Sequence, residues 1–92
     1  MIESIRHKGL KRLYEKGDPS NLKPEFIPRI ENRLTRLEAA SDIKDLNVPG
    51  YDLHRLAGKL KGFWSIKISD NWRIIFRFEE GNVYDLDLID YH

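Results

Sequence analysis

The chain has 92 residues but no cysteine, and its apolar runs are never longer than a few residues. Without cysteine there is no disulfide framework, no thiolate nucleophile and no cysteine-based zinc site. Without a long apolar run, no segment is suited to span a membrane. The opening residues 1–6 also lack the apolar stretch of a secretion signal, so we expect a cytoplasmic protein without membrane contact.

Lysine and arginine are absent from residues 78–92, which carry five acids, whereas residues 1–77 carry all 16 Lys and Arg against 10 acids. The formal net charge of +1 hides this asymmetry. A basic body followed by an acidic segment suits a protein that holds polyanions and places its own carboxylates nearby. Alternatively, the acids simply pair with basic neighbours across a sheet. Both interpretations remain open at this stage.

Repeats, low-complexity tracts and long linkers are also missing, so residues 1–92 are expected to form one domain. Residues 7–16 have apolar side chains at helical spacing, and Gly17 is suited to cap that helix. A second helix is predicted over 24–40, where Ile27, Ile30, Leu34 and Leu37 form an apolar stripe. One further helical turn is predicted at 43–46.

Strand patterns occupy the start and the second half of the chain. The predicted strands are 2–6, 51–57, 63–69, 72–78 and 83–89. The element order β-α-α-β-β-β-β predicts an α+β fold with two helices on one face of a small, largely antiparallel sheet. In the last strand, Tyr84, Leu86 and Leu88 are expected to share the core face. The opposite, polar face should carry Ser65, Lys67, Arg73, Arg77, Asp85 and Asp87.

The chain closes on three groups that can exchange or orient a proton, Asp90-Tyr91-His92. Metal-free RNA cleavage needs a base for the 2′-hydroxyl, a cation for the phosphorane and an acid for the departing 5′-oxygen. Proton transfer could come from His54 and the terminal triplet. The cation could come from Arg73 with Lys59 or Lys61. Further substrate contacts could come from Lys67, Arg77 and Tyr51, the last by stacking on a base.

Each candidate has a simpler interpretation. His54 could be an ordinary surface histidine, and His92 a frayed terminal residue. Arg77 could pair with Asp85 or Asp87, and His7 at a helix start is expected to be structural or solvated. The three histidines are scattered and show no HxH or HExxH spacing, so neither a metal site nor a cofactor is expected. The residues alone are consistent with an acid–base site and do not identify a substrate.

The sequence resembles the HigB toxins of the RelE superfamily over its whole length. The shared residues are Met1-Ile2-x-Ser4-Ile5-x-His7-Lys8-Gly9-Leu10, Leu53-His54-x-Leu56, Gly62-Phe63-Trp64-Ser65-Ile66, Asn71-Trp72-Arg73-Ile74-x-Phe76 and Asp90-Tyr91-His92. The resemblance implies a ribosome-dependent mRNA endonuclease that cuts the codon in the A site and leaves a 2′,3′-cyclic phosphate without a metal. It also implies a HigA-like helix-turn-helix antitoxin, with DNA contacted only through that partner.

The resemblance implies roles for five residues. Arg73 would meet the scissile phosphate, His54 and His92 would transfer protons, Asp90 would orient an imidazole or act as base, and Tyr91 would position the nucleotide. One departure is Ala57, where family members often place a lysine. Two other classes therefore stay open: a module that binds RNA or a protein without cutting, and a structural partner of a DNA-binding repressor.

Overall fold

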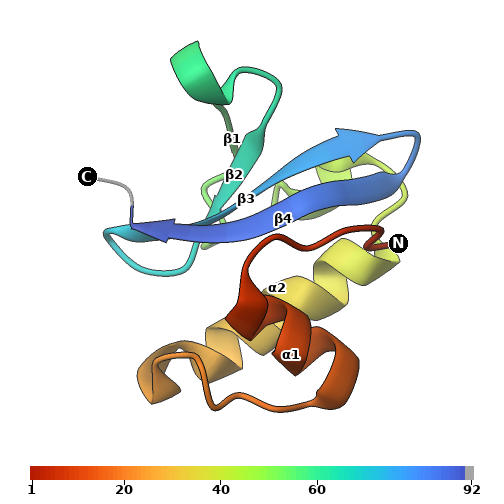
Figure 1. Cartoon of the computed structure of the whole chain (residues 1–92). Coiled ribbons are helices and arrows are strands. Elements are labelled where there is room, and N and C mark those ends of the chain that lie inside the picture. The colour runs from red at the N-terminus through yellow and green to blue at the C-terminus, as the bar shows by residue number, and fades with distance from the viewer. Residues whose placement is uncertain (91–92) are drawn as a thin grey trace.

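The computed structural model describes residues 1–90. The helices are α1 (Lys8–Lys16) and α2 (Ile27–Ala39), with short 3-10 turns η1 (Pro24–Phe26), η2 (Ile43–Leu46) and η3 (Gly58–Leu60). The strands are β1 (His54–Arg55), β2 (Trp64–Lys67), β3 (Trp72–Glu79) and β4 (Asn82–Asp90). They form one antiparallel sheet in the order β1-β2-β3-β4, and both helices lie on the same side of it (Figure 1). The predicted α+β architecture is confirmed.

Both predicted helices form, and their ends have identifiable causes. The His7 Nδ1 atom accepts hydrogen bonds from the backbone N–H groups of Gly9 and Leu10, at 3.1 and 3.2 Å, and so caps α1. Gly17 ends that helix with a φ of 68°, a left-handed conformation that glycine adopts without steric cost. The segment predicted as one helix over 24–40 begins as η1 and becomes an α-helix only at Ile27.

The core lies between the helices and the covered face of the sheet. The predicted helical stripe supplies three of its buried residues, and the strands supply the facing ones. The fully buried apolar side chains are Leu10, Ile30, Leu37, Leu46, Ile66, Ile74, Phe76, Val83 and Leu86. No helix within residues 1–90 is both long and apolar enough to cross a membrane.

The strand predicted at 2–6 is present only as two isolated parallel bridges to β4, Ile2 to Val83 and Ile5 to Leu86. The interruption coincides with a bulge in β4, where the register against β3 shifts between Ile75 and Arg77 and Asp85 has a φ of 54°.

The bulge also reverses one predicted face. Val83 is fully buried, whereas Tyr84 lies opposite Arg77 on the open face of the sheet. The prediction that Tyr84 shares the core face with Leu86 and Leu88 is therefore wrong. One inserted residue moves every side chain on its far side to the other face of a strand.

The strand predicted over 51–57 is reduced to the two residues of β1. The segment that leads into β1 is bent, because Gly50 and Asp52 both have positive φ angles, 88° and 48°. Beyond β1 the chain passes through η3 and returns as β2, and this hairpin projects from the sheet on the side away from the helices (Figure 1). The short strand and its bent approach shape the candidate site.

Candidate active site

Arg73 lies on β3, and its side chain is only 12% exposed. Its Nη2 donates to the backbone oxygen of Asp52 at 2.5 Å, and its Nη1 to the Asp52 Oδ2 at 3.3 Å. The Nε atom donates to the hydroxyl of Ser65, which is fully buried, and Nη2 also reaches the Ser65 carbonyl at 3.5 Å. These four hydrogen bonds leave one of the five guanidinium N–H groups for a ligand.

His54 lies beside this pair, with its side chain 56% exposed. Its Nδ1 is 2.8 Å from the backbone oxygen of Asp52 and 3.5 Å from the Asp52 Oδ1. Because a carbonyl oxygen can only accept, Nδ1 carries the proton in this contact. In the neutral imidazole Nε2 then holds the lone pair, which is the arrangement that a general base requires.

Asp52 is the residue that sequence reasoning missed. It contacts both Arg73 and His54, and so joins a largely buried cation to an exposed imidazole. Its left-handed backbone turns the carbonyl toward both partners, and aspartate tolerates that conformation better than most residues. The signal in the sequence was an Asp-x-His spacing just after Gly50, a residue favoured in turns.

Lys67 is the predicted substrate-binding cation that the structure brings next to Arg73. The two residues are directly opposite one another in the β2–β3 register, so their side chains share the open face. The Lys67 Nζ is 3.5 Å from the Oδ1 of Asp70, a carboxylate whose side chain is 97% exposed. Such an exposed pair contributes little and is easily exchanged for a ligand.

Lys59 and Lys61 are exposed on the projecting hairpin, in and just after η3. They follow Ala57, which precedes this turn and supplies no side-chain cap. No contact joins either lysine to Arg73 or His54 in the part of the chain that the structure describes. That Lys59 or Lys61 takes the place of the lysine that family members often have where this chain has Ala57 stays a prediction.

Arg77 and Tyr51 are placed where a ligand contact is not favoured. Arg77 forms an ion pair with Asp85 at 3.6 Å, as the alternative interpretation expected, and a second one with Glu79 at 2.9 Å. Tyr51 is only 3% exposed, with its hydroxyl 2.5 Å from the Asn32 Oδ1 and the Arg33 guanidinium 4.3 Å from its ring centre. The expectation that Tyr51 stacks on a base does not fit this burial, because the ring presents no free face.

Asp90 ends β4 directly opposite Trp72, so its side chain belongs to the helix side of the sheet. The neighbouring row pairs Arg73 with Ile89 on the open face. β4 is also separated from β1 by two strands. Convergence of the terminal triplet on His54 would therefore depend on Tyr91 and His92, and both lie outside the described residues.

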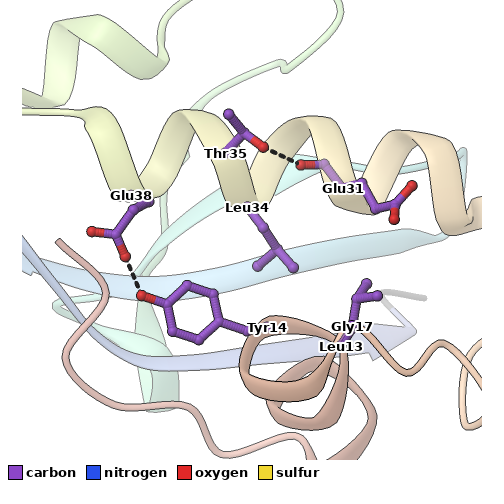
Figure 2. A pocket seen from close by; sticks show the side chains of 7 residues that line it. All are labelled: Leu13, Tyr14, Gly17, Glu31, Leu34, Thr35 and Glu38. Atoms are coloured by element: carbon purple, nitrogen blue, oxygen red, sulfur yellow. Dashed lines mark hydrogen bonds between the residues drawn. The ribbon is translucent and has the colours of Figure 1, made fainter.

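A hollow of about 380 Å³ lies between α1 and α2 (Figure 2), and these helices lie on the side of the sheet opposite the projecting hairpin (Figure 1). The hydroxyl of Tyr14 donates to the Glu38 carboxylate across it, and this bond, more than burial, raises the pKa of Tyr14 to about 12. The phenol therefore stays protonated near neutral pH and is not suited to exchange a proton. Glu38 also accepts from the backbone N–H of Ile2 at 3.3 Å, which gives this cluster a structural role.

Comparison with known proteins identifies the family. The sequence model of the HigB-like toxins, described as RelE-like toxins of type II toxin–antitoxin systems, matches residues 3–92. The chain belongs to the HigB-like toxin family. Membership of a type II system implies an antitoxin as partner of this HigB-like toxin.

Two curated relatives and two solved structures resemble this HigB-like toxin. It is 46% identical to the Endoribonuclease HigB of Proteus vulgaris over 92 residues, the whole of both chains. It is 35% identical to Toxin HigB-1 of Vibrio cholerae serotype O1 over 86 residues, 88% of this chain and 87% of the relative. Two structures of YafQ from E. coli, one of them a histidine-to-glutamine mutant, match with TM-scores of 0.58 for the mutant and 0.53 for the other, at 19% and 15% identity. Each covers 95% of this chain and 87% of YafQ, which supports the fold alone.

Proposed function

We propose that this HigB-like toxin is an endoribonuclease that cuts messenger RNA in the ribosomal A site. The nuclease activity is supported by the family and by the 46% identity, over the whole chain, to a protein named as an endoribonuclease. The ribosome, its A site and messenger RNA as the substrate are inferred from the resemblance to the HigB toxins. The single structural observation that carries the chemistry is the Arg73–Asp52–His54 cluster.

In the proposed reaction, His54 Nε2 takes the proton of the ribose 2′-hydroxyl. The 2′-oxygen then attacks the adjacent phosphorus, and the bond from phosphorus to the 5′-oxygen breaks. The products are a 2′,3′-cyclic phosphate and a 5′-hydroxyl, so no water, metal or other co-reactant enters the balance. The Asp52 carboxylate stabilises the imidazolium that forms, because it lies 3.5 Å from Nδ1.

The proton for the departing 5′-oxygen is assigned to the terminal triplet, with His92 as the donor and Asp90 as its orienting group. Tyr91 would position the nucleotide. These assignments rest on the family motif at residues 90–92. Proton transfer by one positioned group contributes roughly 10²- to 10⁴-fold, so a base and an acid together give a useful rate.

Negative charge on the pentavalent phosphorus is proposed to be stabilised by Arg73 and Lys67. Arg73 contributes mostly through its field, because four hydrogen bonds already hold its guanidinium. Lys67 has the more accessible charge, since it pairs with the exposed Asp70. Charge stabilisation of this kind is often the largest single contribution to catalysis.

We infer that a HigA-like helix-turn-helix antitoxin neutralises the toxin, and that DNA is contacted only through that partner. Support comes from membership of a type II toxin–antitoxin family. Purification of the toxin with the product of a neighbouring helix-turn-helix gene tests this. Failure of the two chains to form a stable complex would contradict it.

A non-cleaving RNA-binding module is the second candidate. It is favoured by Ala57, where the family often has lysine, and by the internal hydrogen bonds of Arg73. Such a module would associate with ribosomes in a salt-dependent way and leave the message intact.

The deciding experiment incubates the toxin with ribosomes carrying a defined message and maps new RNA ends, with His54→Ala and His92→Ala in parallel. We expect wild type to give A-site cuts whose 5′-hydroxyl ends accept phosphate from polynucleotide kinase, and each variant to lose at least about 100-fold in rate. Arg36→Gln, an exposed change on α2 outside the candidate site, should cut normally. A message left intact by wild type, with ribosome binding retained, would favour the module.

A further inference from the structure

A hollow of about 480 Å³ opens at the edge of the sheet beside the end of β2. It is lined by three cations from two elements, Arg29 and Arg33 on α2 and Lys67 on β2. One acid lines it as well, Asp70, whose side chain is almost fully exposed. A hollow with three positive groups and a single exposed negative one is chemically suited to an anion.

The two arginines are fixed in place before any ligand arrives. Arg29 Nη1 donates to the backbone oxygen of Ile68 at 3.0 Å, and Arg33 Nε donates to that of Lys67 at 3.1 Å. Arg33 also reaches the Gly50 carbonyl at 3.3 Å and lies over the ring of Tyr51. These guanidiniums satisfy backbone carbonyls at the end of β2 and directly after it. Little side-chain entropy remains to be lost on binding.

The charge of the two arginines is not compensated locally. Within residues 1–90 no ion pair joins Arg29 or Arg33 to a carboxylate. Burial lowers the pKa of Arg33, Tyr51 opposes that change, and the nearby charge of Arg29 lowers the pKa again. Two guanidiniums that repel one another across a hollow are stabilised by a shared anion.

The hollow is continuous with the candidate active site through Lys67. That residue lines the hollow and is also the register partner of Arg73. The cations therefore run from the middle of the sheet, around the edge of β2, to the exposed side of α2. A row of separated positive groups matches a polymer with a regular series of phosphates better than a single small anion.

We propose that the Arg29–Arg33–Lys67 hollow is a second phosphate subsite that binds the backbone of single-stranded or ribosomal RNA outside the scissile position. The proposal rests on the proposed function in taking RNA as the ligand. Arg29 supplies the accessible guanidinium, Arg33 holds the floor of the hollow, and Lys67 links the subsite to the phosphate that reacts.

The test measures binding of a short single-stranded RNA whose riboses are 2′-O-methylated, so that attack by the 2′-oxygen is blocked. Arg29→Gln should weaken binding roughly five- to tenfold at low salt. It should also reduce the slope of log affinity against log salt by about 0.7, the value for one phosphate contact on a single strand. Arg36→Gln is the matched control, with the same charge change on the same helix but outside this hollow.

Asp70→Asn tests the same subsite in the opposite direction and does not remove a packing contact, since the side chain is exposed. It should tighten RNA binding, whereas Glu15→Gln, an equal charge change on α1, should not. A second series of binding measurements uses ribosomes without message as the ligand. Weaker binding of Arg29→Gln to both ligands supports a general RNA backbone subsite, and weaker binding to ribosomes alone supports ribosomal RNA as its source.

Equal affinities and salt slopes for Arg29→Gln and Arg36→Gln in both arms would overturn the subsite, as would no gain from Asp70→Asn. Cleavage assays with wild type run in parallel. If wild type fails to cut any message, the proposed nuclease function fails, while the binding arms still decide whether the subsite exists.

Discussion

Arg73 shows how one side chain can hold a site together. Its guanidinium connects β3 to Ser65 on β2 and to the bent segment at Asp52 that leads into β1. A planar fork of five donors can make these contacts at once, and an ammonium group cannot. The position of His54 therefore depends on arginine geometry as well as on positive charge.

Arg73→Lys is expected to lower the free energy of unfolding by about 2 kcal/mol, because several hydrogen bonds of a largely buried charged group are lost. Arg77 on the same strand is itself exposed, so Arg77→Lys should cost less than about 0.5 kcal/mol. Urea unfolding monitored by tryptophan fluorescence measures both. Similar losses in the two variants would contradict an anchoring role for Arg73.

The residue scale is also where sequence reasoning was weakest. It selected His54, Arg73 and Lys67, which lie on the three neighbouring strands β1, β3 and β2. It did not select Asp52, and it offered Tyr51 as a stacking platform. Both failures have one cause, because the contacts that decide them, Asp52 with Arg73 and Tyr51 with Asn32, join residues 21 and 19 positions apart in the chain. Local periodicity carries no information on such contacts.

At the scale of elements, α1 and α2 are joined across their hollow by the Tyr14–Glu38 hydrogen bond (Figure 2). The folded state raises the pKa of Tyr14 from 10.0 to about 12, chiefly through this bond. A raised pKa means that the fold favours the protonated phenol. The stability due to this contact is therefore complete below pH 10 and is lost as the pH rises from about 10 to about 12.

Tyr14→Phe should consequently flatten the loss of stability between pH 10 and pH 12. The effect should be modest, because the Tyr14 side chain is 38% exposed and solvent screens the interaction. Urea midpoints of wild type and variant across this range measure it. Tyr84→Phe serves as the control tyrosine. Parallel curves for wild type and Tyr14→Phe would show that the bond does not stabilise the helix pair.

The bulge in β4 explains which parts of the fold could be predicted. Helix positions, the Gly17 cap and the turn at 43–46 follow from local patterns, and all three are confirmed. The face of Tyr84 could not be predicted, because alternation continues unbroken in the sequence while Asp85 is inserted into the ladder. A positive φ at an aspartate leaves no pattern that distinguishes it from an ordinary strand residue.

Asp85 variants separate the backbone conformation from the ion pairs with Arg6 and Arg77. Asp85→Asn removes the charge but tolerates a positive φ, whereas Asp85→Ala loses the charge and adds strain. We expect the alanine variant to be about 1 kcal/mol less stable than the asparagine variant. Thermal unfolding of the two proteins gives the difference. Equal stabilities would indicate that the bulge relaxes to a regular strand.

At the scale of the whole molecule, the two ends of the sheet carry different sets of charged residues. Acids of the closing segment pair with Arg6 and Arg77 at one end of the sheet. Lys67 and the arginines of α2 gather at the other end, beside the candidate site. The interpretation that the acids pair with basic neighbours is therefore confirmed at one end of the sheet, whereas polyanion binding at the other end stays a prediction.

Lys67→Gln and Arg77→Gln remove one charge each from the same sheet face. Arg77 is four residues from Arg73, about 13 Å along the strand, which exceeds the screening length of about 10 Å at 0.1 M salt. We expect Lys67→Gln to slow message cleavage roughly fivefold at low salt, with the difference shrinking as salt rises. Arg77→Gln should leave the rate unchanged. Equal slowing by both variants would mean that the total charge of the domain attracts RNA, and that the arrangement of its cations does not matter.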